Sequence, residues 1–354
     1  MTTYDIHELV VPANAGDADA GDFADSLELM AASEAEAYAT DELHQTAAEL
    51  LPFWQDLANP RRLFGVKIDG VLVARGVYDW LVDETTTAYV RVDVRAHFRR
   101  RGIGTAVLEH LESLARADDR TKLITYAASK DADGARLDSP TGFGSLPLAN
   151  ADVQFLLGNG FSLEQVERGS RLPLPHDAED LRARFAAASA RAGADYTLHH
   201  WLGSTPRRWL DDVAMLHTRM STDAPSAGLE EPEDVYTPDR VADNEQKQSA
   251  SRELLTAVVE HVPTGHLVGY TTLSLPRGEP RPVFQDDTLV LREHRGHRLG
   301  MLLKVANISY LESERPGHPS IITWNAEENR FMLDVNEAVG FEPMGYEGAW
   351  KKHL

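Results

Sequence analysis

Residues 94–104 combine two glycines and three consecutive arginines at a turn, a pattern with a clear chemical consequence. In order, the segment contains Val94, Arg95, Ala96, His97, Phe98, Arg99, Arg100, Arg101, Gly102, Ile103 and Gly104. An apolar strand-like stretch precedes it and a helix-like stretch follows. Glycine lets the chain turn sharply, so that successive N–H groups point outward at the start of the helix. Such amides bind anions, and arginines add charge-assisted contacts, so the pattern predicts a pyrophosphate-binding loop. The competing interpretation is an ordinary basic surface loop.

A second segment of the same kind lies near residue 300. In order, it contains Val290, Leu291, Arg292, Glu293, His294, Arg295, Gly296, His297, Arg298, Leu299 and Gly300. Arg298 stands where the first segment has the earlier of its two final glycines. We expect this loop to form, with a poorer approach of its amides to a phosphate.

Other chemistries do not fit these residues. A dinucleotide fingerprint would require a third glycine at Val107, and the Gly-Lys-Ser/Thr of a Walker loop is absent. The histidine pairs His294-x-x-His297 and His199-His200 lack the context of a zinc motif, so we predict no metal site. The chain has no cysteine, which excludes thiol nucleophiles, disulfides and iron–sulfur clusters.

The net charge and the hydropathy pattern limit the classes of partner that the protein can bind. The 354 residues include 35 Lys and Arg against 56 Asp and Glu, for a net charge of −21. Such a field repels a phosphate backbone, so we expect no nucleic-acid partner. No apolar stretch approaches the length of a membrane span, and residues 1–11 lack the pattern of a signal peptide. We therefore expect a cytoplasmic protein without a membrane partner.

The two halves of the chain repeat the same landmarks in the same order. The matched pairs are Tyr4 and Tyr196, Gly76 and Gly269, Gly104 and Gly300, and Gly160 and Gly340. A recurring order of this kind indicates a duplicated domain. Prolines at 173 and 175, followed by an Ala/Arg-rich run, mark the join. We predict domains at 1–171 and 196–354, with a linker and helix at 172–195.

The expected elements repeat as well. Helices are expected at 25–39, 43–57, 205–220 and 237–250, and hairpins at 62–68 with 71–81 and 252–262 with 266–275. In each half, a strand (88–94, 288–291) leads through the Gly/Arg loop into an amphipathic helix and then a buried strand (122–127, 320–324). Each half closes with a helix, a Gly-Phe turn and a last strand. The acidic segment 221–236 is expected to be a mobile loop.

At this level of detail the chain resembles the GNAT N-acetyltransferase superfamily. Arg99-x-x-Gly102-x-Gly104 is similar to its R/Q-x-x-G-x-G/A signature. The segment Asn329-x-x-Met332-x-x-Val335-Asn336-x-x-x-Gly340-Phe341 resembles its N-x-x-A-x-x-L-Y-x-x-x-G-F pattern. The resemblance covers nearly the whole chain as two tandem domains, the layout of mycothiol synthase and related actinobacterial acetyltransferases. It implies an α/β (α+β) fold in which helices flank a mixed, mostly antiparallel sheet in each domain.

The resemblance also implies a site and a cofactor. Acetyl-CoA would lie between the fourth and fifth strands of the C-terminal domain, 288–292 and 320–324, with Asn329 as a contact and an N–H near Leu291 holding the thioester carbonyl. In the N-terminal domain, Ala149 and Leu156 fall on the family's Asn and Tyr positions. The C-terminal domain is therefore expected to be catalytic. The N-terminal domain keeps its loop but has a degenerate acceptor side. The cofactor-binding residues would come from both loops: Val290, Leu291, Arg292, Arg295, Gly296, His297, Arg298, Leu299, Gly300 and Asn329, and Val94, Arg99, Arg100, Arg101, Gly102, Ile103 and Gly104.

Acetyl transfer to an amine needs a base and a means of protonating the leaving thiolate. Asp287, with Asp286 beside it, and Glu260 are the candidate bases. Asn336 occupies the position where many family members carry a Tyr acid, so Tyr346, Tyr270 or water would have to supply the proton. Without cysteine, direct transfer in a ternary complex is favoured over an acetyl-enzyme.

We therefore expect an acetyl-CoA-dependent N-acetyltransferase that acts on a primary amine of a small molecule or peptide. The alternative is a CoA-binding sensor or interaction protein without turnover. Neither half has a Tyr at the position of the family's Tyr acid, which favours this alternative. The Asn that is retained at position 329 favours the enzyme. The sequence does not name the acceptor, and it leaves open a monomer or a homodimer.

Overall fold

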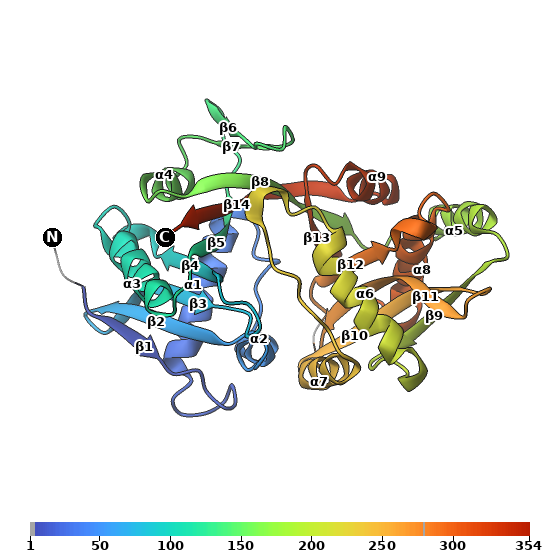
Figure 1. Ribbon diagram of the computed structural model, residues 1–354, viewed down its shortest axis with the longest axis horizontal. Helices are drawn as coiled ribbons and strands as arrows, with labels where there is room; N and C mark the ends of the chain where they lie inside the picture. The colour runs from blue at the N-terminus through green and yellow to red at the C-terminus, as the bar shows by residue number, and fades with distance from the viewer. Residues whose placement is uncertain (1–3, 279) are drawn as a thin grey trace.

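A twelve-stranded sheet runs through the molecule, with helices on both faces (Figure 1). The computed structural model describes residues 4–278 and 280–354. The strand order is β1-β2-β3-β4-β5-β14-β8-β13-β12-β11-β10-β9, and a separate two-stranded hairpin joins β6 and β7. None of the helices in the described part of the chain is long and apolar enough to cross a bilayer.

The elements follow the expected repeat. The first half contains β1 (Ile6–Leu9), α1 (Gly21–Tyr38), α2 (Ala47–Trp54), β2 (Arg61–Ile68), β3 (Val71–Asp79), β4 (Thr87–Val94), α3 (Ile103–Ala117), β5 (Lys122–Ser129), β6 (Arg136–Asp138), β7 (Ser145–Pro147), α4 (Ala151–Gly158) and β8 (Ser162–Pro173). The second half contains α5 (Ala178–Ala192), β9 (Tyr196–Leu202), α6 (Leu210–Asp223), α7 (Pro238–Gln248), β10 (Arg252–His261), β11 (His266–Pro276), β12 (Val283–Val290), α8 (Leu299–Glu314), β13 (Ser320–Ala326), α9 (Arg330–Val339) and β14 (Glu342–His353). The mixed α/β class with a mostly antiparallel sheet is confirmed.

The two halves exchange their last strands. β14, from the end of the chain, pairs with β5 of the first half, while β8 pairs with β13 of the second half. β8 and β14 also pair with each other, and Figure 1 shows them side by side as they cross between the two lobes. Because each half is completed by a strand of the other, neither half is a closed sheet by itself. β8 therefore runs across the predicted boundary at residue 171.

The helix α3 shows how the first half positions its glycine loop. Its buried residues Ile103, Val107, Leu108 and Leu111 lie on one face and pack in a core cluster with β3 and β4. A Cβ on Gly76 of β3 would lie 2.6 Å from Val107 Cγ1, so only glycine allows this close approach of helix and sheet. The packing fixes the start of α3 directly beyond the end of β4.

In each half the fourth and fifth strands pair for only a short distance. β4 and β5 run parallel and pair at 87–89 with 122–124, and β12 and β13 pair at 283–284 with 321–322. Beyond these pairs the strands diverge, and each of the two glycine loops follows the diverging strand. A gap between two strands therefore opens next to each predicted anion-binding loop.

The acidic segment 221–236 differs from the expected mobile loop. A 3-10 turn at Ala227–Leu229 buries Leu229 completely against the first half. Lys122 Nζ donates to the Leu229 carbonyl at 3.1 Å, and the Tyr126 hydroxyl donates to Glu231 at 2.6 Å. The segment is held because β5 and β14 supply apolar contacts to Leu229 and β5 supplies donors for its carbonyl and carboxylate oxygens.

Candidate active site

A cavity of about 1220 Å³ lies in the first half and extends to the second. Its walls come from α1, the α1–α2 connection, β4, the glycine loop, β5 and α4, and from β12, β13 and β14. The lining residues used below are Glu34, Glu36, Tyr38, Arg91, Val92, Asp93, Val94, Arg99, Arg100, Gly102, Ile103, Gly104, Asn150, Phe284, Asp286, Trp324 and Glu347. The cavity thus joins the first predicted anion-binding loop to side chains that lie far away in the sequence.

The loop before α3 leaves amide groups free at the cavity. Arg100 and Gly102 both adopt left-handed backbone conformations, with φ of +61° and +84°. Gly102 is the N-cap of α3, and no side chain caps this helix end. The first N–H groups of a helix have no partner within the helix, so they are available to an anion. A Cβ at Gly102 would meet no atom within 4 Å, and the space in front of these amides is open.

The second loop adopts the same backbone shape with its glycine and arginine interchanged. Gly296 and Arg298 take φ values of +85° and +57° at the two left-handed positions. The anchoring contact also repeats: Arg99 Nε donates to the Val94 carbonyl at 2.9 Å, and Arg295 Nε donates to the Val290 carbonyl at 3.0 Å. A left-handed conformation costs a non-glycine residue about 1–2 kcal/mol, and Arg298 tolerates it here.

Carboxylates from α1 in the first half and from α6 in the second half hold the loop arginines. In the first half, Arg99 makes two hydrogen bonds to Glu36, at 2.7 and 2.9 Å. In the second half, Arg292 and Arg295 lie 3.5 and 3.7 Å from the carboxylate of Asp223. The Asp223 side chain is only 3 % exposed, whereas that of Glu36 is 51 % exposed. A phosphate would therefore compete with a buried carboxylate at the second loop and with a solvated one at the first.

One polar side chain links β12 and β13 directly beside their paired residues. The Thr323 hydroxyl donates to the Gln285 carbonyl at 3.2 Å, and both side chains are buried. The N–H of Leu291 donates to the Val268 carbonyl at 2.9 Å. The amide of Leu291 itself therefore points away from the gap, whereas that of the preceding residue, Val290, points toward β13.

In the first half, backbone amides point into the gap. The Arg95 N–H donates to the Val73 carbonyl at 2.9 Å. Since amides alternate in direction along an antiparallel strand, those of Val92 and Val94 point from β4 toward β5. Both residues line the cavity. They can act as donors to an oxygen that gains negative charge during a reaction.

The predicted bases Asp287 and Glu260 lie outside the large cavity. Asp287 accepts from the Tyr270 hydroxyl at 3.1 Å, in a small neighbouring cavity of about 170 Å³. Glu260 lies 2.7 Å from His199, between β9 and β10. The structure therefore does not bring these two carboxylates together with the first loop.

The remaining predicted residues of the second half have structural partners. Asn329 caps α9 by accepting from the Met332 N–H at 3.3 Å. Asn336 is buried and donates to Asn325 at 2.6 Å. Tyr346 lies on β14 and packs against the core of the first half. None of the three lines the large cavity.

Asn150 is a cavity residue that sequence comparison of the halves missed. It directly precedes α4, as Asn329 precedes α9. Its Nδ2 donates to Ser129 Oγ at 2.9 Å and to the Lys130 carbonyl at 2.6 Å, which fixes the start of α4 beside β5. Aligning the two halves on their Gly-Phe turns puts Ala149, and not Asn150, at the position of Asn329. The reason is that Asn150 lies 10 residues before Gly160 (160 − 150 = 10), whereas Asn329 lies 11 residues before Gly340 (340 − 329 = 11).

Two carboxylates from the second half complete the cavity. Asp286 on β12 forms no hydrogen bond or ion pair with any described residue. Desolvation and the neighbouring Asp287 raise its pKa to about 7, against the opposing effect of Arg252. Desolvation also raises the pKa of Glu347 on β14 to about 7, against the opposing effect of Arg91. Carboxyl groups with pKa values near neutrality can accept a proton at physiological pH and pass it on. Asp286 was noted in the sequence only as the neighbour of Asp287, and Glu347 carried no sequence signal.

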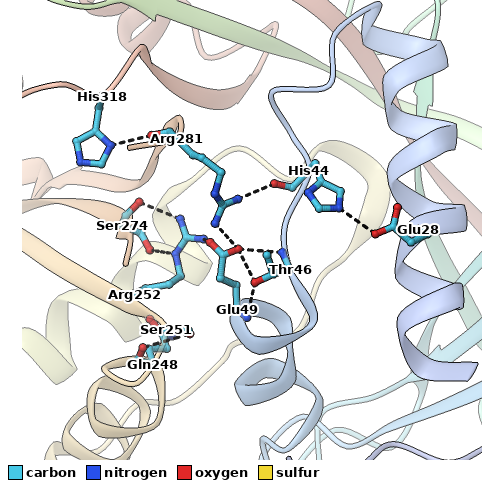
Figure 2. Close-up of polar contacts among 10 residues, drawn as sticks. All are labelled: Glu28, His44, Thr46, Glu49, Gln248, Ser251, Arg252, Ser274, Arg281 and His318. Atoms are coloured by element: carbon cyan, nitrogen blue, oxygen red, sulfur yellow. Dashed lines mark hydrogen bonds and ion pairs between the residues drawn. The ribbon is translucent and has the colours of Figure 1, made fainter. Parts of the chain in front are cut away.

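A buried ion-pair network attaches the cavity wall formed by the α1–α2 connection to the second half (Figure 2). Glu49 of α2 is 3 % exposed and binds Arg252 at 3.1 Å and Arg281 at 2.5 Å. Burial by itself raises the pKa of Glu49, but hydrogen bonds from Thr46 and Arg281 bring it below its usual value. Arg281 also donates to the His44 carbonyl at 3.0 Å. The network holds the second half in contact with this wall of the cavity.

Comparison with known proteins agrees with this geometry. Residues 27–136 match the acetyltransferase (GNAT) family. A tandem GNAT protein from the clavulanic acid biosynthesis pathway is 27% identical, with a TM-score of 0.69 and 99% and 98% of the two chains covered. A GCN5-related N-acetyltransferase from Sphaerobacter thermophilus is 15% identical, with a TM-score of 0.63 and 99% and 95% covered, and shares the fold. No curated protein sequence matched the chain. The chain therefore contains a domain of the GNAT acetyltransferase family and has, over its whole length, the fold of a tandem GNAT protein.

Proposed function

We propose that the protein transfers an acetyl group from acetyl-CoA to an amine, and that both substrates meet in the cavity of the first half. The observation that carries this proposal is the continuity of the cavity from the free amides of the Gly102 loop to the carboxylate of Asp286. The proposed working loop is thus the first one and not the second, where the resemblance to the family had placed it.

Acetyl-CoA would supply the acetyl thioester as a substrate. The amides at the start of α3 and the side chain of Arg100 would hold its pyrophosphate, for which the open space before Gly102 provides room. The amides of Val92 and Val94 would face the acetyl carbonyl oxygen and stabilise the negative charge that develops there.

Asp286 would act as the base. In its ionised form it takes a proton from the ammonium group of the acceptor, which frees the nitrogen lone pair. The nitrogen then bonds to the acetyl carbon, the carbon–sulfur bond breaks, and one of the two protons remaining on nitrogen passes to the departing thiolate. Asp286 returns its proton to water, so that one ammonium and one thioester give one amide, one thiol and one proton.

Turnover with a panel of primary amines tests the proposal. Release of the CoA thiol should depend on the amine, and Asp286→Asn should lower kcat by about 10²- to 10⁴-fold. Asp211→Asn is a matched control, because Asp211 is an exposed carboxylate on α6 outside both cavities. If Asp287→Asn were inactive while Asp286→Asn kept its activity, the base would be Asp287 and the active site would lie in the second half. Tight acetyl-CoA binding without turnover would support the non-catalytic alternative.

A further inference from the structure

The cavity wall contributed by the second half carries a distinct combination of groups. Trp324 stacks on Phe284, with ring centroids 6.1 Å apart and an interplanar angle of 16°. The edge of Tyr38 meets Trp324 at 6.2 Å, and the indole Nε1 donates to the Tyr38 hydroxyl at 2.9 Å. Glu347 lies beside these rings and accepts from the same hydroxyl at 3.4 Å. Aromatic faces next to a carboxylate are groups that bind an organic cation.

The charges in this part of the cavity are not balanced. The cation that acts on Glu347 is Arg91, which is already bound by Glu34 at 3.1 Å and by Asp93 at 3.0 Å. The cation that acts on Asp286 is Arg252, which is already bound by Glu49 at 3.1 Å. Within the described part of the chain, neither Asp286 nor Glu347 forms an ion pair of its own. The arginines at the other end belong to the predicted phosphate loop. An acceptor with a carboxylate would be repelled here, whereas one with two positive charges would satisfy both groups.

The strand exchange adds a second carboxyl group behind Glu347. Glu347 on β14 stands directly opposite Glu167 on β8, and the two residues occupy equivalent positions in the two halves. Desolvation and the proximity of Glu347 raise the pKa of Glu167 to about 8. The groups facing Glu347 from the packed elements are Glu34 and Tyr38 of α1, Arg91 of β4 and Glu167 of β8. The pair therefore holds a proton at neutral pH that an incoming cation would displace.

We propose that the acceptor is a dication, such as an α,ω-diamine, whose second ammonium group binds at Glu347 against Trp324 and Tyr38 while its first reaches Asp286. This inference rests on the proposed function, because it describes the acceptor of the same site. The partner class is set by two carboxylates on one aromatic wall that form no ion pair with any described residue.

Binding can be measured apart from catalysis. Isothermal titration at pH 7, with coenzyme A present in place of acetyl-CoA, would compare 1,5-diaminopentane, 1-aminopentane and 5-aminopentanoate. We expect the diamine to bind at least about tenfold more tightly than the monoamine, as one further charge-assisted contact provides, and the amino acid to bind most weakly. Diamine binding should also release protons, seen as an enthalpy that depends on the buffer.

Three variants distinguish binding of the second ammonium group at Glu347 from a general attraction between the diamine and the acidic protein. Glu347→Gln should remove most of the preference for diamine over monoamine. Glu167→Gln, which lies behind the cavity wall, should keep the preference but reduce proton release, and Asp211→Asn should keep both. Equal binding of the diamine and the monoamine by wild type would overturn the proposal. So would an unchanged preference in folded Glu347→Gln. If that variant fails to fold, a Glu167→Gln protein with unaltered proton release contradicts the assignment.

The two proposals fail separately. Acetylation of amines without a diamine preference would leave the acetyltransferase proposal intact and overturn the subsite. A diamine preference in binding without transfer of acetyl to any amine would support the subsite and overturn the catalytic proposal.

Discussion

Gly102→Glu should abolish acetyl-CoA binding, whereas Gly300→Glu should leave it unchanged. Gly102 is the N-cap of α3 with φ of +84° and an open space before it, so a glutamate there would project into the position proposed for the pyrophosphate. Two like charges about 4 Å apart repel by about 4 kcal/mol at the effective dielectric typical of a protein surface. That energy corresponds to a dissociation constant about 10³-fold weaker.

The backbone contributes a smaller effect that a matched variant isolates. Any side chain at Gly102 must adopt a left-handed conformation, at a cost of about 1–2 kcal/mol in folding. Gly102→Gln has the same size and the same strain as the glutamate but no charge. The difference in binding between Gly102→Gln and Gly102→Glu therefore measures the repulsion alone.

Isothermal titration of acetyl-CoA into the four proteins is the assay. Wild type and Gly300→Glu should each bind one acetyl-CoA per chain with the same affinity, and Gly102→Gln should bind somewhat more weakly. Loss of binding in Gly300→Glu alone would refute the assignment of the site to the first half. Equal loss in Gly102→Gln and Gly102→Glu would show that the electrostatic argument is wrong.

Three further outcomes are expected. The kcat/KM of wild type should rise with pH through about pH 7, because Asp286 must be ionised to act as a base and its pKa is about 7, and Asp286→Asn should flatten this limb of the profile. Glu49→Gln should lower the free energy of unfolding by about 3–5 kcal/mol in urea denaturation, because two arginines of the network lose their buried counter-charge; a loss below about 1 kcal/mol would contradict this. The pKa values of Glu167 and Glu347 are raised from 4.5 to about 8 and about 7, so the folded protein keeps protons that the unfolded chain releases; the contribution of this pair to stability is fully present at acid pH and is lost as pH rises from the unfolded pKa through the folded values. The melting temperature should fall across this window, and Glu167→Gln should reduce the fall.

Local patterns predicted the elements and the two glycine loops well. The loop conformations follow from residues that tolerate or require a left-handed backbone, and the amphipathic spacing of α3 follows from the face it buries. The duplicated landmarks predicted a tandem arrangement; the tandem fold and a GNAT family domain at residues 27–136 are confirmed. These properties depend on contacts between residues close in sequence, which the order of the side chains specifies directly.

The exchange of β8 and β14 could not be predicted in the same way. Each of the two strands is the last strand of its half, and the two have similar residue patterns. Either strand could therefore pair with the fifth strand of either half. Which neighbour it takes depends on the pairing of strands far apart in the chain. The same pairing brings Glu167 opposite Glu347, a contact that neither local sequence indicates.

The sequence by itself determined the repeated fold, the two candidate anion-binding loops and the absence of a thiol nucleophile, because each depends on residue type and local spacing. Only the tertiary structure decided which side chains lie beside each strand gap. The gap of the first half forms part of a cavity that Asp286 and Glu347 complete from the other half of the chain. The physical reason is that a cavity is the space left after distant side chains have packed, and its charges come from whichever strands the sheet places beside it.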